Sequence, residues 1–363
     1  MGMTQTTTRR SNRRFKVKVE PPVVETEPTA TPVCPSCGSR HVQKRDWFTR
    51  TVRDINGPIQ ITQKRYYCPR CSRTFMVYPW GITHRQFTTR VDFTVALLYH
   101  LGLSFENICL FLRTYGLEID PSTEWRHWAD MGEGIFGRIK RRRFGSPVVH
   151  VDQGYLRVGK EEKCFNVAYS PDGLILDVEF MDDETAGSFY RIFSDLAERY
   201  GARVITGDFH SSHEAACIEA GIEFQGCYFH YLRNLLKWKP LLKKHLGDDW
   251  KAFYELAKWV HPRNEADFWE HGMRAPPGSF LREYCMWVSE RINSLMTGMR
   301  FGYGLPPGYT NNVSERGILR TKARARTTRG LGSLRGAIAF VSMTQRISEA
   351  IERGSLRPGD LGL

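Results

Sequence analysis

The stretch SPVVHVDQGYLRVGKEEKCFNVAYSPDGLILDVEFM, residues 146–181, contains three runs of β-branched and aromatic residues. Runs of this kind, bounded by turn residues, are typical of β-strands. The Pro-Asp-Gly sequence at 171–173 predicts a tight turn between the second run and the third. The stretch therefore predicts three consecutive strands that form a meander, and it indicates where a sheet begins.

The residues after this meander alternate between helical and strand patterns. Helical patterns at 185–201 and 211–221 alternate with short apolar strand patterns at 202–209 and 222–230. This order suits a mixed sheet flanked by helices. From about 231 to 305 the pattern is helical and rich in Trp and Lys. The expected fold class is therefore α/β, with a mixed sheet and a helical insertion inside a domain that spans 147–350.

The N-terminal part has a different signature, two Cys-x-x-Cys pairs formed by Cys34, Cys37, Cys68 and Cys71. Each pair places two thiolates about one metal ion, and two pairs complete a tetrahedron around Zn²⁺. A gap of 30 residues with strand-like alternation separates the pairs, so we expect a zinc ribbon with a long hairpin at 32–80. Nine cysteines in this pattern indicate a reducing compartment rather than a disulfide framework.

Residues 85–145 show three helical patterns joined by short turns that contain Gly, which predicts a helix-turn-helix DNA-binding domain. Ser104 is the expected N-cap of the second helix. On the third helix we expect Arg126 and His127 to face DNA, whereas Trp125 and Trp128 are expected in the core.

The charge of the chain favours a polyanionic partner. The net charge is +13 with a pI near 9.4, and nucleic acid is the first partner to consider for a globular protein this basic. A basic run at 138–143 is either a solvated face or a contact to a DNA backbone. Residues 1–31 predict a disordered basic tail. No run of about 18 apolar residues and no secretory signal occur, so we expect no membrane partner and a cytoplasmic, nucleoid-associated location.

Two carboxylates fall at unusual places in the predicted sheet. Asp152 lies in the first strand after VVHV, and Asp208 follows the apolar strand VITG. A charge on a buried strand is costly unless a cation compensates it. Asp208 has a second interpretation as the cap of the helix that follows, since Ser211 and Ser212 come directly after it.

A third carboxylate, Glu315, is the only acidic residue of YTNNVSERGILRTKARARTTRGLGS, residues 309–333. One interpretation is a capping box with Asn312 at the N-cap. The other is that Glu315 meets Asp152 and Asp208, because carboxylates that converge repel one another until divalent cations such as Mg²⁺ or Mn²⁺ bind them. Five basic residues after Glu315 would then contact the DNA backbone: Arg320, Lys322, Arg324, Arg326 and Arg329.

Taken in this order, the motifs resemble the DDE transposases of insertion sequences, which have an RNase H-like core. The resemblance covers roughly 32–345 and implies that Asp152, Asp208 and Glu315 are the catalytic, metal-binding acids. The N-terminal features are similar to the IS6-like group. Asp208 and Glu315, however, are 107 positions apart, and a long insertion is typical of the IS256, Mutator-like and ISL3 groups.

Cys227-x-x-His230 lies inside this interval and resembles the Cys-x-x-His motif of the IS256 and Mutator-like groups. Two residues cannot complete a tetrahedral zinc site, so we expect Cys227 and His230 to support the active site through hydrogen bonds. Trp259 and Trp287 of the insertion are expected in its helical core, with stacking on an unpaired base as the alternative.

The resemblance implies a transposase that binds the ends of a mobile element, cleaves them with Mg²⁺ or Mn²⁺, and joins the 3′-OH to target DNA. Synapsis of two ends implies a homodimer or a larger assembly, and an insertion sequence implies a prokaryotic host. Two alternatives stay open: a domesticated transposase that acts as a DNA-binding regulator, and an RNase H-like nuclease or resolvase that cuts without strand transfer.

Overall fold

The computed structural model describes residues 32–78, 81–143, 145–306, 309–328, 331–354 and 356–363. The predicted tail at 1–31 and the predicted phosphate contact Arg329 lie outside these residues. The chain divides into two compact units. The first takes in the residues up to Met131 together with Arg346–Leu363, and the second is Gly132–Gln345.

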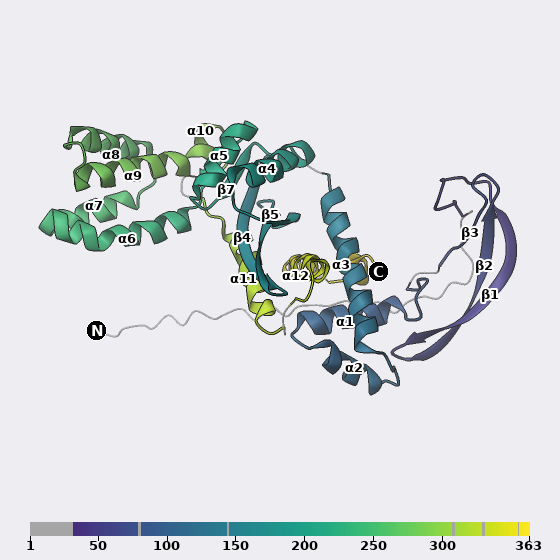
Figure 1. Ribbon diagram of the computed structural model, residues 1–363. Coiled ribbons are helices and arrows are strands. Elements are labelled where there is room, and N and C mark those ends of the chain that lie inside the picture. The colour runs from purple at the N-terminus through teal and green to yellow at the C-terminus, as the bar shows by residue number, and fades with distance from the viewer. Residues whose placement is uncertain (1–31, 79–80, 144, 307–308, 329–330, 355) are drawn as a thin grey trace, which may run out of the picture. The chain divides into compact units, whose positions relative to one another are not determined.

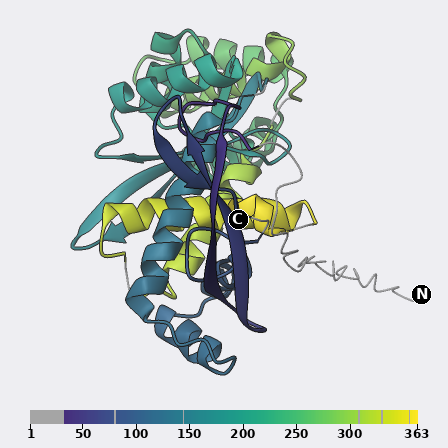
Figure 2. The same ribbon diagram turned by 90° about the vertical axis from the view of Figure 1, so that its right-hand side faces the viewer.

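The first unit begins with a three-stranded antiparallel sheet of β1 (Gln43–Asp54), β2 (Gly57–Cys68) and β3 (Arg73–Met76). β1 and β2 form a long twisted hairpin (Figures 1 and 2), as the spacing of the cysteine pairs predicts. Among the described residues its apolar cluster is small, with Val52, Ile61 and Ile82 as the buried members, and the buried Tyr66 stacks on Phe75. Such a sheet has little hydrophobic stabilisation of its own.

Three helices follow in this unit, α1 (Thr89–His100), α2 (Phe105–Arg113) and the start of α3 (Pro121–Arg141). The Ser104 hydroxyl accepts a hydrogen bond from the backbone N–H of Asn107 at 3.3 Å, so the predicted N-cap is confirmed. Trp128 is buried, and its ring centre lies 4.7 Å from that of Tyr99, which confirms its predicted core position.

The two residues expected to face DNA on α3 differ in their surroundings. Arg126 is exposed, and its guanidinium bonds to the carbonyl of Ser122 one turn earlier. His127 is 18% exposed, and its Nδ1 lies 3.7 Å from a carboxylate oxygen of the buried Asp92. That His127 faces DNA stays a prediction.

The second unit contains the predicted mixed sheet. Its strands are β4 (Val148–Val158), β5 (Glu161–Tyr169), β6 (Ile175–Met181), β7 (Val204–Gly207) and β8 (Glu223–Gly226), in the order β6-β5-β4-β7-β8. The pairs β4–β5 and β5–β6 are antiparallel, whereas β4–β7 and β7–β8 are parallel. Helices α4 (Ala186–Tyr200) and α5 (Ser211–Ala220) share a large apolar core with β4 (Figure 1).

The last predicted strand, 222–230, is wrong in its second half. β8 ends at Gly226, and Tyr228 begins a helix, α6 (Tyr228–Leu246). Tyr231, Leu235 and Leu242 are buried along one side of α6, and this helical spacing prevails over the β-propensity of the aromatic run.

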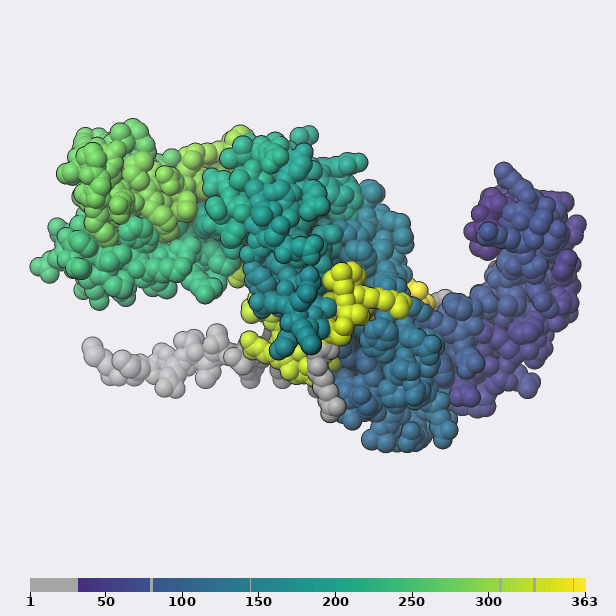
Figure 3. All heavy atoms as spheres, viewed as in Figure 1, coloured from purple at the N-terminus to yellow at the C-terminus, as the bar shows by residue number. Residues whose placement is uncertain are grey.

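The predicted helical insertion is present. After α6 come α7 (Trp250–Ala257), α8 (Pro262–Arg274), α9 (Phe280–Leu295) and α10 (Thr297–Arg300), and these helices form a lobe of their own beside the sheet (Figure 3). Trp287 packs in this lobe with its ring 5.6 Å from that of Tyr231, as expected. Trp259, by contrast, is 70% exposed, so its predicted core position is wrong. It follows directly on Lys258, the C-cap of α7.

One buried side chain joins the two ends of this insertion. The Gln225 amide on β8 donates to the carbonyl of Leu295 at 2.6 Å, and its Oε1 accepts from the N–H of Gly298 at 2.7 Å. The next residue, Gly226, donates its N–H to Ser294 Oγ at 3.2 Å. The chain therefore leaves the sheet and returns to it at the same place.

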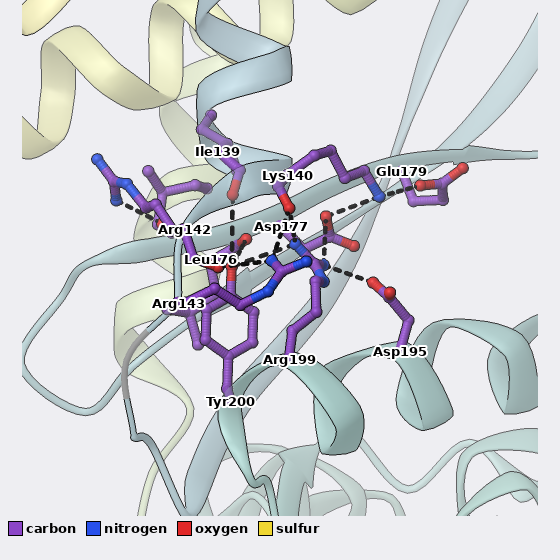
Figure 4. A network of polar contacts seen from close by, with 11 residues as sticks. Ile139, Lys140, Arg142, Arg143, Leu176, Asp177, Glu179, Asp195, Arg199 and Tyr200 are labelled. Atoms are coloured by element: carbon purple, nitrogen blue, oxygen red, sulfur yellow. Dashed lines mark hydrogen bonds and ion pairs between the residues drawn. The ribbon is translucent and has the colours of Figure 1, made fainter.

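The basic run at the end of α3 binds the sheet (Figure 4). Lys140 Nζ lies 2.7 Å from the buried carboxylate of Asp177 on β6, and Arg199 of α4 reaches the same oxygen at 3.1 Å. Arg142 donates to the carbonyl of Ile175 at 2.6 Å. Burial opposes the charged form of Lys140, but the Asp177 and Glu179 carboxylates outweigh it and raise its pKa. Lys140 and Arg142 therefore bind the end of α3 to the sheet, and neither side chain belongs to a solvated face.

The remaining helices are α11 (Asn312–Ala325) and α12 (Leu334–Glu352), with short 3₁₀ turns at Gly247–Asp249 and Pro358–Leu361. Within the described residues, no helix has both the length and the apolar character that crossing a membrane requires.

Candidate active site

Strand β4 presents different residues to its two faces. Val149 and Val151 belong to the core beneath α4 and α5. Side chains alternate along a strand, so His150 and Asp152 point to the opposite face. There α11 runs alongside β4 (Figure 1), and a Cβ on Gly154 would lie 3.2 Å from Ile318 of that helix. Asp152 is thus held between a sheet and a helix.

The charge of Asp152 reflects this environment. Burial, together with the nearby carboxylates of Asp208 and Glu315, raises the pKa of Asp152 to about 7, against the lowering effects of the Gln153 N–H and the charge of Lys322. The Gln153 N–H donates to Asp152 Oδ1 at 2.9 Å. The three acids singled out in the sequence are therefore electrostatic neighbours.

Asp208 directly follows β7, the parallel neighbour of β4. Its Oδ1 lies 3.0 Å from Nδ1 of His213, and the side chain is one third exposed. Burial opposes ionisation of Asp208, but the hydrogen bond and charge of His213 and the charges of His230 and His210 outweigh it and lower the Asp208 pKa. The alternative capping role of Asp208 is wrong, because His210 is the N-cap of α5 and the helix has no side-chain cap.

His213 is a site residue that the sequence reasoning missed. It is fully buried, and its second ring nitrogen lies 2.6 Å from the Gln153 amide nitrogen. The ring therefore connects Asp208 to the residue next to Asp152. Gly207 leaves room for it, since a Cβ there would lie 3.2 Å from His213 Nδ1 and 3.3 Å from Val151. The only signal for His213 in the sequence is its place on the predicted helix after Asp208.

Glu315 lies in the first turn of α11. The helix begins at Asn312, its N-cap is Asn311, and no side chain caps it, so the capping-box alternative is wrong. The Glu315 carboxylate instead meets the start of α6. Its Oε1 lies 3.4 Å from His230 Nδ1, and it accepts a hydrogen bond from the Cys227 thiol across 3.5 Å. Burial raises the pKa of Cys227 to about 11.

Asn311 is a second residue that the sequence reasoning missed. It is fully buried, its Nδ2 donates to the carbonyl of Val151 at 2.5 Å, and its N–H donates to Cys227 Sγ at 3.2 Å. Its Oδ1 lies 3.1 Å from Nδ1 of His150, whose pKa burial lowers to about 4. Asn311 therefore joins β4, the start of α6 and the start of α11. Its neighbour Asn312 had been given the capping role.

Helix α11 is fixed from behind by a buried polar cluster. The Gln345 amide of α12 donates to the carbonyl of Gly317 at 3.1 Å and to Thr321 Oγ1 at 2.8 Å, and Tyr169 of β5 donates to Gln345 Oε1. A Cβ on Gly317 would lie 2.5 Å from the Tyr169 hydroxyl oxygen. Only glycine permits this close approach of helix and strand.

The basic residues after Glu315 are not equivalent. Arg326 is exposed, and Arg320 and Lys322 are half-buried, whereas Arg324 is only 8% exposed and bonds to Thr327. We expected Arg324 at the surface, where it would contact a DNA backbone, but its side chain is buried. A cavity of about 320 Å³ lies beside these residues, and its lining includes Tyr155, Arg157, Lys322 and Arg326.

The four cysteines of the first unit form a second cluster, with all four sulfurs within 4.8 Å of one another. Cys34 Sγ lies 3.6 Å from Cys71 Sγ, and Cys37 Sγ lies 3.6 Å from Cys68 Sγ. These spacings fit four thiolates around one Zn²⁺. Burial opposes ionisation of Cys34, but the N–H groups of Ser36 and Cys37 outweigh it and lower its pKa to about 6. The four-cysteine cluster can thus bind a structural metal such as zinc.

A scan of the chain against models of protein families finds no family that matches, and a search of curated proteins finds no similar sequence.

Proposed function

We propose that this protein is a DNA transposase of the DDE type with an RNase H-like core. One observation carries the proposal: Asp152, Asp208 and Glu315 come from three distant parts of the chain, and the last two raise the pKa of the first. Carboxylates close enough to raise the pKa of a buried neighbour are costly without a cation, so this arrangement favours a metal-dependent function.

The topology supports the RNase H-like assignment. A meander of three strands is followed by two parallel strands, each reached through a helix, so that β4 and β7 are neighbours in the sheet. Asp152 and Asp208 come from neighbouring strands, and α11, which carries Glu315, packs on the face of β4 opposite to α4 and α5.

Oxygen ligands of this kind suit Mg²⁺ or Mn²⁺, and a pair of such ions would activate a nucleophilic oxygen and stabilise the leaving oxygen of a phosphodiester. Asp208 is prepared for this role, since its lowered pKa keeps it ionised at neutral pH. Asp152, with a pKa near 7, gives up its proton when a cation arrives. Asn311 and His213 hold the elements that carry the acids.

The DNA partner follows from the basic residues. Lys322, Arg326 and Arg157 line the cavity beside α11, where they would bind phosphates next to the scissile bond. In the proposal the zinc-binding four-cysteine cluster and helices α1–α3, with Arg126 exposed, recognise the ends of the mobile element. Synapsis of two ends makes a homodimer or a larger assembly, acting on the nucleoid in the cytoplasm of a prokaryotic host.

The test uses the full chain, Mg²⁺ and linear DNA that carries the segments flanking its coding sequence. We expect cleavage that leaves a 3′-OH, followed by joining of a pre-cleaved end to a target plasmid. Asp152→Asn should lower the rates of cleavage and of joining by at least about 1,000-fold, because a carboxylate ligand is lost, while DNA binding persists. The matched control is Asp182→Asn, whose carboxylate is 96% exposed on the surface of the same unit.

The outcomes separate the alternatives. Undiminished cutting by Asp152→Asn would refute the site. Cutting without joining would identify a nuclease or resolvase. Binding of the flanking segments by the wild type without any cutting would identify a regulator.

A further inference from the structure

Glu315 also belongs to another cluster of possible metal ligands, which includes neither Asp152 nor Asp208. Cys227 Sγ, a ring nitrogen of His230 and a carboxylate oxygen of Glu315 all lie within 4.8 Å of one another. Glu315 Oε1 is 3.5 Å from Cys227 Sγ and 3.4 Å from His230 Nδ1. We refer to these three residues as the mixed cluster.

The spacing between His230 and Glu315 in the mixed cluster is poor for hydrogen bonding. A separation of 3.4 Å exceeds the range of about 2.7–3.2 Å for an N–H···O hydrogen bond. His230 Nδ1 is buried and has no hydrogen-bond partner among the described residues. A buried ring nitrogen aimed at a carboxylate oxygen without bonding to it needs another explanation.

The same spacing is that of ligands around one zinc ion. With Zn–S near about 2.3 Å and Zn–N and Zn–O near about 2.0–2.1 Å, tetrahedral geometry separates O from S by about 3.5 Å and O from N by about 3.3 Å. The observed separations of 3.5 and 3.4 Å match both values.

The ligands are also held in place before any ion binds. Cys227 and His230 are three residues apart at the start of α6, so they lie on one side of its first turn. The N–H of Asn311 fixes the sulfur at 3.2 Å, and Glu315 lies in the first turn of α11. The buried Gln345 keeps α11 in position. Three protein ligands with a water as the fourth are a common arrangement for zinc.

We propose that the mixed cluster is an inhibitory site for a thiophilic divalent cation of the Zn²⁺ class. Thiolate and imidazole ligands select such ions over Mg²⁺, which prefers oxygen. An ion bound there takes a carboxylate oxygen of Glu315 away from Asp152 and Asp208. Zinc therefore opposes the magnesium-dependent reaction; this part of the inference rests on the proposed function.

The first measurement is metal content, which does not depend on activity. The full chain is equilibrated with excess ZnSO₄, desalted and analysed for zinc per chain. We expect two ions in the wild type, one in the four-cysteine cluster and one in the mixed cluster. Cys227→Ser and His230→Gln should each retain one, and Cys217→Ala, which removes a buried thiol outside both clusters, should retain two. Circular dichroism confirms that each variant is folded.

A wild type that holds a single zinc ion, or a Cys227→Ser variant that still holds two, would overturn the mixed cluster as a metal site. The double variant Cys34→Ser/Cys37→Ser provides the reciprocal control. It should lose one ion and keep the other, and a loss of both would also contradict the assignment.

The second measurement is the Mg²⁺-dependent cleavage of the flanking DNA with and without added zinc. Inhibition is the ratio of the cleavage rate without zinc to the rate with zinc. We expect it to be at least tenfold in the wild type and less than twofold in Cys227→Ser. Equal inhibition of both proteins would refute the competition. If the wild type does not cleave under any condition, the proposed function and the inhibition fail together, while the zinc content still decides whether the site exists.

Discussion

The four-cysteine cluster and the acid centre, formed by Asp152, Asp208 and Glu315, place candidate metal ligands in opposite structural settings. Among the described residues, the four cysteines lie beside a sheet with a small apolar cluster that buries Val52, Ile61 and Ile82. The three acids lie on or beside a sheet with a large core beneath α4 and α5. A metal bound in the first region would stabilise the fold, whereas in the second region the fold itself positions the side chains.

This difference has a physical basis in how each set of ligands is held. Cys68 ends β2, Cys71 lies in the turn that follows it, and a metal bound by the four thiolates would fix their side chains relative to one another. In the acid centre, by contrast, His213 lies 3.0 Å from Asp208, and Asn311 joins the strand of Asp152 to the helix of Glu315. The elements that carry the three acids are therefore held in place by contacts within the protein.

The largest expected effect is on the four-cysteine cluster. In Cys34→Ser/Cys37→Ser, loss of the metal removes a contribution on the order of 10 kcal/mol, because metal binding is coupled to folding of small zinc domains. We expect the amides of β1 and β2 to lose hydrogen-exchange protection by about 100-fold or more, while those of β4 and β5 keep theirs.

Cys109→Ala is the matched control, since Cys109 is a buried free thiol of the same unit outside the cluster. Its hairpin amides should exchange as in the wild type. Retained protection of β1 and β2 in the double variant would show that the apolar core suffices and would remove the contrast between the two regions.

A smaller effect is expected at the acid centre, where a substitution should raise the stability of the fold instead of lowering it. The pKa of Asp152 is about 7 in the folded protein, well above its value in an unfolded chain, so the folded state holds an extra proton between about pH 4 and 7. Stability therefore falls as the pH rises through this window. Without divalent cations, Asp152→Asn should be more stable than the wild type at pH 8, by on the order of 2–4 kcal/mol.

The measurement is urea unfolding of both proteins at several pH values between 4 and 8, in EDTA. The advantage of Asp152→Asn should grow with pH and level off above pH 7, and it should shrink when Mg²⁺ stabilises the wild type. Asp182→Asn, with its exposed carboxylate, should show neither trend. An Asp152→Asn variant less stable than the wild type at pH 8 would mean that the acid centre carries no stored repulsion.

The smallest effect concerns the support behind Glu315. Tyr169→Phe removes the hydroxyl that donates to the buried Gln345 Oε1, and an unsatisfied buried acceptor costs about 1–3 kcal/mol. We expect that loss in urea unfolding, together with faster hydrogen exchange in α11. Tyr115→Phe, at a tyrosine that is 48% exposed, should change stability by less than about 0.5 kcal/mol. Unchanged exchange in α11 would show that the buried cluster does not hold the helix.

Much of the fold could be predicted from local pattern. The meander, the alternating helices and the helical insertion follow from periodicity, and the cysteine pairs follow from spacing. The strand prediction failed at Tyr228, where an aromatic run looked like β-structure although Tyr231 and Leu235 belong to a helical stripe. The core position predicted for Trp259 was wrong because the exposure of a side chain depends on which helices lie next to it, and a local sequence pattern does not contain that information.

The acidic residues of the candidate site could be predicted from the sequence, but the residues that hold them in place could not. Asp152, Asp208 and Glu315 stood out because a carboxylate on an apolar strand or at the head of a basic helix is unusual. His213 and Asn311 did not, since a His on a helix and an Asn before one are ordinary in sequence. Their role arises from partners such as Gln153 and Cys227, which are 60 and 84 positions away.

Gln225 has a consequence for how such a protein changes over time. It bonds to both Leu295 and Gly298, so the two ends of the lobe of α6–α9 meet at one place on the sheet. The chain between these two ends can lengthen or shorten while the residues at the ends keep their positions. Under the proposed function, the number of residues between Asp208 and Glu315 is therefore free to drift, and enzymes with different spacings can share one reaction geometry.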